Sequence, residues 1–317
     1  MISLFGGILT IILVAIVVTL LLAPLETLQA AHYPGSTEKE EENTLPQGER
    51  DAAPVFVVFV SGIGSISGDA LLEAETRFLD RLDAAVPDAR IVRDVFPYAP
   101  SGRPLLTGQR VFSGFWRLVG RMRAEGSGLL GIVLNLRNLY QVMVSADSRY
   151  GPLYSNSIAH IAADRLRAAG YSFGSGTPIV LLGSSGGAQI SAGAAQFLGQ
   201  LTGGHISIVT FGGIMSSDPG LTDVDEVVSY YGDSDPVYRL GRIVFPGRWP
   251  VLANSVWNRA LADGTLHEIS IGGMVHSGAG GYLDPADWHS GQSRLDVTVS
   301  RVAQSVTEIA KAKTAPL

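Results

Sequence analysis

Two segments match G-x-S-x-G, the motif in which a sharp turn presents a serine side chain as a nucleophile. They are Gly170–Gly174, centred on Ser172, and Gly183–Gly187, centred on Ser185. The motif needs a strand before it and a helix after it, because the strained turn between them pushes the serine Oγ out of the edge of a sheet. An activated serine attacks acyl carbonyl groups, so the chemistry would be acyl transfer.

The sequence context favours Ser185. The apolar run Ile179–Leu182 predicts a strand directly before it, and the small residues of 186–200 predict a helix directly after it. Ser172 instead follows a predicted helix over 152–169 and lies in a Gly-rich loop. The alternative for Ser185 is a strand–helix turn that binds phosphate through backbone N–H groups, although it lacks the Gly-Lys-Ser/Thr ending of a P-loop.

A serine nucleophile needs a general base, and the base needs an acid that orients it. With this motif the chain order is Ser, then Asp or Glu, then His. Two aspartates, Asp233 and Asp235, follow a predicted strand over Val227–Tyr231. We take Asp235 as the acid because it lies farther into the loop, where Pro236 stiffens the chain; Asp233 is the alternative. One of the two aspartates is expected to cap the turn.

His276 is the predicted base, because it follows the predicted strand His267–Ile271 and comes after the acid in the chain. His289, 13 residues later, is the competitor. The other histidines lie in the N-terminal linker, in a helix before the motif or at strand starts, namely His32, His160, His205 and His267.

The developing oxyanion needs two backbone N–H donors. One should be the N–H of Gly186, directly after the nucleophile. The other should come from the Gly-rich loop Ser61–Ser65, where we favour Ile63 over Gly62. The alternative is that this loop is an ordinary turn with no such role.

Alternating strands and helices should position these residues. Apolar, β-branched runs and amphipathic periods predict an α/β fold, with a mostly parallel sheet of about six strands and helices on both faces. The predicted strands are Val55–Val60, Ile91–Phe96, Ile179–Leu182, Ile206–Phe211, Val227–Tyr231 and His267–Ile271, and the predicted helices cover 69–85, 152–169, 186–200 and 293–312.

The N-terminus predicts a membrane anchor. Residues 2–23 carry no charge, and as a helix they would span about 33 Å, enough for ~30 Å of hydrocarbon. We therefore predict a retained transmembrane helix over 1–24, an acidic linker over 25–53 and a domain over 54–317. A cleaved signal peptide is the alternative. With almost no flanking Lys or Arg, orientation is weakly specified, and we favour a domain outside the cytoplasm.

Composition narrows the function classes. The chain of 317 residues has a net charge of −6 and only 16% charged residues, which argues against a nucleic-acid-binding protein. It has no Cys, so a catalytic thiol, a thiolate zinc site and disulfides are excluded. No metal or organic cofactor is implied. The apolar stretch within 100–150 predicts either a lid or acyl-binding cap, or a helix pair packed on the sheet.

These motifs together resemble the α/β-hydrolase superfamily. The matching segments are Val60–Gly64, Gly183–Gly187, Gly232–Val237 and His276–Gly278, and the resemblance covers about residues 54–310. Ser61 stands where many relatives carry His, and no strand precedes Val55–Val60, so the sheet is expected to be minimal. Pro24–Leu28, Leu106–Phe112 and Phe245–Pro250 are similar to segments of uncharacterised membrane-anchored bacterial hydrolase-like proteins. That similarity implies fold and anchoring but no substrate.

The sequence thus predicts a membrane-anchored serine hydrolase of the esterase or lipase type. Its partners would be the lipid bilayer and a small acyl substrate, with lipid-like esters or thioesters as candidates. The alternative is a non-catalytic anchored binding module of the same fold. Transfer of the acyl group to an alcohol rather than to water is also open.

Overall fold

The computed structural model describes residues 53–64, 71–98 and 128–314. The predicted anchor, nearly all of the linker and the first part of the predicted lid region lie outside these ranges. Within them, no helix has both the length and the apolar composition needed to cross a membrane.

A parallel sheet forms the centre of the described domain. It contains β1 (Val55–Val60), β2 (Ala89–Val92), β3 (Ile179–Ser184), β4 (Ile206–Phe211), β5 (Glu226–Tyr231) and β6 (Leu266–Ser270), in the order β2-β1-β3-β4-β5-β6. Every neighbouring pair is parallel. The predicted mostly parallel sheet of about six strands is therefore confirmed.

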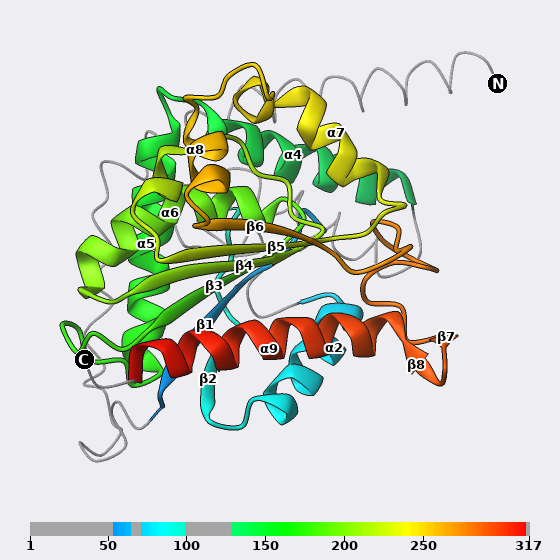
Figure 1. Ribbon diagram of the computed structural model, residues 1–317, viewed down its shortest axis with the longest axis horizontal. Coiled ribbons are helices and arrows are strands. Elements are labelled where there is room, and N and C mark those ends of the chain that lie inside the picture. Colours follow the sequence, from blue (N-terminus) through cyan, green and yellow to red (C-terminus); the bar gives the residue numbers. More distant parts are fainter. Residues whose placement is uncertain (1–52, 65–70, 99–127, 315–317) are drawn as a thin grey trace.

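Helices cover both faces of the sheet (Figure 1). α2 (Glu73–Ala85) and α9 (Arg294–Thr314) lie on one face, and α5 (Gly151–Ala168), α6 (Gly187–Thr202) and α8 (Val256–Ala262) lie on the other. α4 (Gly128–Ala146) packs against α5 and α6, and α7 (Pro236–Val244) follows β5. The central strands β1, β3 and β4 are buried along their whole length and mostly apolar, because successive side chains point to opposite faces and both faces are covered.

Two hydrophobic cores result. Along β1, Phe56, Val58 and Val60 join the core beneath α5 and α6. Val55, Val57 and Phe59 join the core beneath α2 and α9. Because all strands are parallel, their carboxyl ends meet at one edge, and the loops that leave this edge are brought together in space.

Some element boundaries differ from those predicted. The second strand is Ala89–Val92, not Ile91–Phe96, because its pairing with β1 ends at Val92. Val95 and Phe96 are still buried, so burial alone produced the apolar pattern that predicted a longer strand. A short antiparallel pair, β7 (Asp287–His289) and β8 (Gln292–Ser293), was not predicted.

Phe78 of α2 tests the core between α2, α9 and the sheet. Its fully buried ring packs against Phe211, with centroids 4.9 Å apart, and against Phe59. Phe78→Ala should lower the free energy of unfolding by about 3–5 kcal/mol through lost burial and a residual cavity. Chemical denaturation followed by circular dichroism measures the change. Ile243→Ala, at an exposed helical position, is the control and should change the free energy of unfolding by less than about 0.5 kcal/mol. Equal losses in both variants would contradict the place of Phe78 in the core.

Candidate active site

Ser185 occupies a strained turn between β3 and α6. Its φ of +49° is unusual for a residue with a side chain, and among the described non-glycine residues only Ser290 also has a positive φ. A Cβ on Gly183 would lie 2.7 Å from the Ala188 Cα, and one on Gly187 would lie 2.2 Å from the Val60 carbonyl oxygen. Both flanking positions therefore require glycine, and the turn holds Ser185 in the geometry of a nucleophile elbow.

The structure brings Ser185, His276 and Asp235 into one hydrogen-bonded series. Ser185 Oγ lies 2.8 Å from His276 Nε2, and His276 Nδ1 lies 2.9 Å from Asp235 Oδ2. The three side chains follow β3, β6 and β5, so they meet at the carboxyl edge of the sheet. Asp235 is fully buried and His276 mostly so.

The competing residues lie elsewhere. Ser172 sits after α5 and before β3, at the amino edge of the sheet. Asp233 Oδ1 accepts a hydrogen bond from Ser270 Oγ at 2.8 Å, and its carbonyl accepts one from Arg239. His289 is exposed in β7, against the ring of Trp288. None of these side chains has a hydrogen bond to the series formed by Ser185, His276 and Asp235.

Asp235 has two structural roles at once. Its Oδ1 caps α7 by accepting the backbone N–H groups of Val237 and Tyr238, at 2.8 and 3.1 Å. Its Oδ2 faces His276. Burial raises the pKa of Asp235, but hydrogen bonds from His276, Tyr282 and the Tyr238 N–H outweigh burial and leave this pKa below its ordinary value. An ionised Asp235 only accepts, so the proton of neutral His276 lies on Nδ1 and Nε2 is free to accept from Ser185.

Tyr282 completes the surroundings of Asp235 and was missed by sequence reasoning. Its OH donates to Asp235 Oδ2 at 2.7 Å and accepts the Gly232 N–H at 2.8 Å. Burial and the neighbouring Asp235 carboxylate raise the pKa of Tyr282, so the phenol keeps its proton. No local motif marks this residue, because 47 residues separate it from Asp235.

The loop after β1 is held by a buried carboxylate that was also missed. Glu75 of α2 accepts the Gly62 N–H at 3.2 Å through Oε1, and the Ser184 hydroxyl approaches the same oxygen at 3.4 Å. Its Oε2 accepts the Leu72 N–H at 3.3 Å, at the start of the helix. The Gly62 N–H is thus directed to Glu75, which argues against Gly62 as an oxyanion donor.

Ile63 and Gly186 adjoin each other beside Ser185. The Ile63 carbonyl accepts from Asn138 Nδ2 at 2.6 Å, which fixes the Ile63–Gly64 peptide group, next to the one that carries the Ile63 N–H. A Cβ on Gly186 would lie 3.0 Å from Ile63 Cγ2 and 2.8 Å from Val142 Cγ2. No residue in the described ranges accepts the backbone N–H of Ile63 or of Gly186. Both N–H groups therefore remain available to a ligand.

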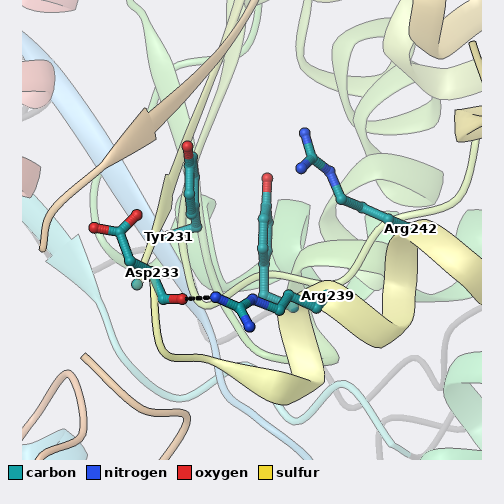
Figure 2. Close-up of a pocket in the computed structure, with 6 residues that line it drawn as sticks. Tyr231, Asp233, Arg239 and Arg242 are labelled. Carbon is teal, nitrogen blue, oxygen red and sulfur yellow. Dashed lines mark hydrogen bonds between the residues drawn. The ribbon is translucent and has the colours of Figure 1, made fainter. Parts of the chain in front are cut away.

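A small hollow lies beside the loop that carries Asp235 (Figure 2). It measures about 180 Å³ and is lined by Tyr231, Gly232, Asp233, Tyr238, Arg239 and Arg242. The rings of Tyr231 and Tyr238 stack in parallel, with centroids 4.7 Å apart. Among the described residues, no cluster of three His, Asp or Glu side chains is arranged to hold a metal ion.

No protein-family model matches the chain, and the search of curated proteins found no match. The chain is similar to the crystal structure of a dienelactone hydrolase-like promiscuous phosphotriesterase from metagenomic libraries. The two share 15% identity over 83% of this chain and 89% of that chain, with a TM-score of 0.45. We therefore infer the function from the chain's own residues.

Tyr282→Phe tests the surroundings of Asp235. The variant leaves the buried Gly232 N–H without its acceptor and removes one donor to Asp235. The free energy of unfolding should therefore fall by about 1–3 kcal/mol. Stability from an ionised carboxylate with a lowered pKa is present above its unfolded pKa and is lost as the pH falls through the folded pKa. With one donor gone, the folded pKa of Asp235 moves up toward its unfolded value, so this loss should be smaller and should end at a higher pH.

Denaturation measured across the acidic pH range checks this prediction. Tyr231→Phe is the matched control, because no hydrogen bond of the Tyr231 hydroxyl occurs among the described residues. Identical acid profiles for Tyr282→Phe and Tyr231→Phe would contradict the role given to Tyr282.

Proposed function

We propose that this protein is a serine hydrolase of the α/β-hydrolase fold, which cleaves carboxylic ester or thioester bonds through an acyl-enzyme. The observation that carries the proposal is the series from Ser185 Oγ through His276 to Asp235, with both links at hydrogen-bond distance. The strained turn at Ser185 adds to it, since a positive φ at a serine between a strand and a helix is the geometry of a nucleophile elbow.

In the proposed reaction, Ser185 Oγ bonds to the substrate carbonyl carbon while its proton moves to His276 Nε2. Asp235 stabilises the imidazolium that forms, and the N–H groups of Gly186 and Ile63 stabilise the oxyanion. His276 then gives the proton to the departing alcohol or thiol. Water attacks the acyl-enzyme with His276 again taking a proton, which releases the acid and restores Ser185.

The strand order also supports the fold assignment. The candidate nucleophile follows β3, the candidate acid follows β5 and the candidate base follows β6, while the oxyanion loop follows β1. In the α/β-hydrolase fold the nucleophile, acid and histidine occur in this chain order, and the second oxyanion donor comes from the loop after an early strand. The sheet here would be a reduced form of that fold.

We further propose that residues 2–23 hold the enzyme on a membrane, with the domain outside the cytoplasm. The length and uncharged composition of this run support anchoring. An enzyme held beside a bilayer has lipid-like acyl esters within reach, and these are the substrates that we would screen first.

Ser185→Ala tests the catalytic assignment. Removing Oγ removes the nucleophile, so labelling by a fluorophosphonate probe should be lost and ester turnover should fall by at least about 10³-fold. Both are measured on the full chain in membranes. Ser172→Ala is the matched control, because Ser172 has the same sequence motif without the turn, and this variant should label like the native chain. No labelling of the folded native chain would favour the non-catalytic binding module.

Asn138→Ala tests whether the hydrogen bond that holds the loop at the Ile63 carbonyl matters for turnover. Without the donor to the Ile63 carbonyl, the adjoining loop should shift relative to Ser185, and kcat should fall by about 10- to 100-fold with little change in KM. Steady-state kinetics on the best ester found measures the split. A native kcat in a folded Asn138→Ala protein would show that the loop is held without Asn138.

A further inference from the structure

Six apolar side chains are exposed on α7 and the segment after it. We call this surface the α7 apolar face, and it consists of Leu240, Ile243, Val244, Trp249, Val251 and Leu252. Ile243 is 67% exposed and Val251 is 80% exposed. Single exposed apolar residues are common on soluble proteins, but a cluster of this kind marks an interaction surface.

The face is continuous. Leu240 and Val244 are four residues apart on α7, so they lie on one side of the helix together with Ile243. The Trp249 indole N–H donates to the Ile243 carbonyl at 3.2 Å, and the Leu252 N–H donates to the Trp249 carbonyl at 2.9 Å. These contacts join the helix and the following segment into one surface.

Beneath this face, the usual distribution of polar and apolar residues is reversed. The Arg248 side chain is only 1% exposed, and it pairs with Glu268 at 2.8 Å and lies over the Trp257 ring at 4.0 Å. A charged side chain is thus buried while leucine, isoleucine and valine beside it face outward. Burying an arginine is costly unless it is paired. The pair with Glu268 therefore keeps Arg248 beneath α7, and the apolar side chains of the face stay on the outside.

The charges within the segment that carries the face have one sign. Residues 236–262 contain four arginines and no Asp, Glu or Lys, although the whole chain has a net charge of −6. Arg239 and Arg242 project from α7 beside the hollow (Figure 2), and Arg259 is exposed on α8. Arg242 and the buried Arg248 share the single carboxylate of Glu268, at 3.2 and 2.8 Å, so the positive charge there exceeds the negative. An apolar surface with Trp and flanking arginines complements the interface of a bilayer that contains anionic lipids.

We propose that the α7 apolar face docks onto the surface of an anionic lipid bilayer. The apolar side chains would enter the boundary between headgroups and acyl chains, and the exposed Arg239 at the edge of the face would meet lipid phosphates. The length of the chain permits this, because the 29 residues 24–52 lie between the end of the apolar run at 23 and the start of the described chain at 53. Such a segment can extend to about 100 Å.

Docking in this orientation would place the candidate catalytic residues next to the lipid. Asp235 caps α7, and Leu240 lies five residues farther on, about 7.5 Å along the helix axis. In this respect the inference rests on the proposed function: an ester-linked acyl chain could pass from the bilayer to Ser185 without crossing bulk water. The docking itself does not depend on catalysis.

The absence of cysteine from the chain makes a direct test simple. Val251→Cys, labelled with bimane in the full chain, is reconstituted into phosphatidylcholine vesicles that contain brominated lipid, with and without phosphatidylglycerol. Docking predicts that the label loses most of its emission to the brominated chains, and more so with phosphatidylglycerol. Gln304→Cys is the matched control: it is exposed on α9, across the sheet from α7, and should keep its emission (Figure 1).

Two results would overturn the proposal. One is equal, weak bromolipid quenching at 251 and 304. The other is a label at 251 that is shielded from aqueous iodide but not quenched by brominated lipid, because a second copy or another protein would then cover the face. Ile243→Asn in the Val251→Cys background should restore emission if docking is correct.

Fluorophosphonate labelling of the same samples separates this inference from the proposed function. Quenching at 251 without labelling of Ser185 would contradict catalysis and leave docking intact. Labelling of Ser185 without quenching would contradict docking alone.

Discussion

The buried carboxylate of Asp235 is the point on which the candidate site depends. One oxygen caps α7 and the other faces His276, so the same ion fixes a helix and orients the His276 ring. Four donors compensate its burial and keep its pKa low. A helix N-terminus stabilises negative charge, and an ionised partner determines which nitrogen of His276 carries the proton. Loss of this charge would disturb α7 and the His276 ring together.

Close packing around Ser185, at the other end of the hydrogen-bonded series, also fixes the position of a side chain in the candidate site. Gly183 and Gly187 leave no room for a Cβ, so β3, α6 and the end of β1 approach each other around Ser185. Glu75 and Asn138 hold the neighbouring loop through Gly62 and Ile63. The backbone around Ser185 is therefore fixed by contacts from several elements, which is the condition under which a strained serine conformation persists.

The same helix connects the candidate site to the outer surface. Asp235 caps the first turn of α7, and the α7 apolar face lies on the far side of the helix and on the segment after it, with Arg248 buried beneath. The inner contacts of α7 serve the site while its outer residues do not contribute to the core. This division explains how a strongly apolar outer face is compatible with a stable fold: the stability comes from Tyr238, Trp257 and the Arg248–Glu268 pair.

The sequence alone predicted the six strands of the central sheet in their chain order and the helices α2, α5, α6 and α9, although it misplaced the bounds of β2 and missed α7 and α8. Continuous apolar runs such as Val55–Val60 predicted buried parallel strands. The strand before Ser185 and the helix after it distinguished this serine from Ser172, which has the same motif. The partners of Asp235 and of the loop at Ile63 could not be predicted, because Tyr282, Glu75 and Asn138 are distant in sequence and carry no local motif. Whether Asp233 or Asp235 faces His276 was likewise decided by tertiary structure, since two residues in one loop differ only in backbone direction. Hydrophobic periodicity indicates which residues are buried, but hydrogen-bond partners depend on the tertiary fold, which brings distant segments of the chain together.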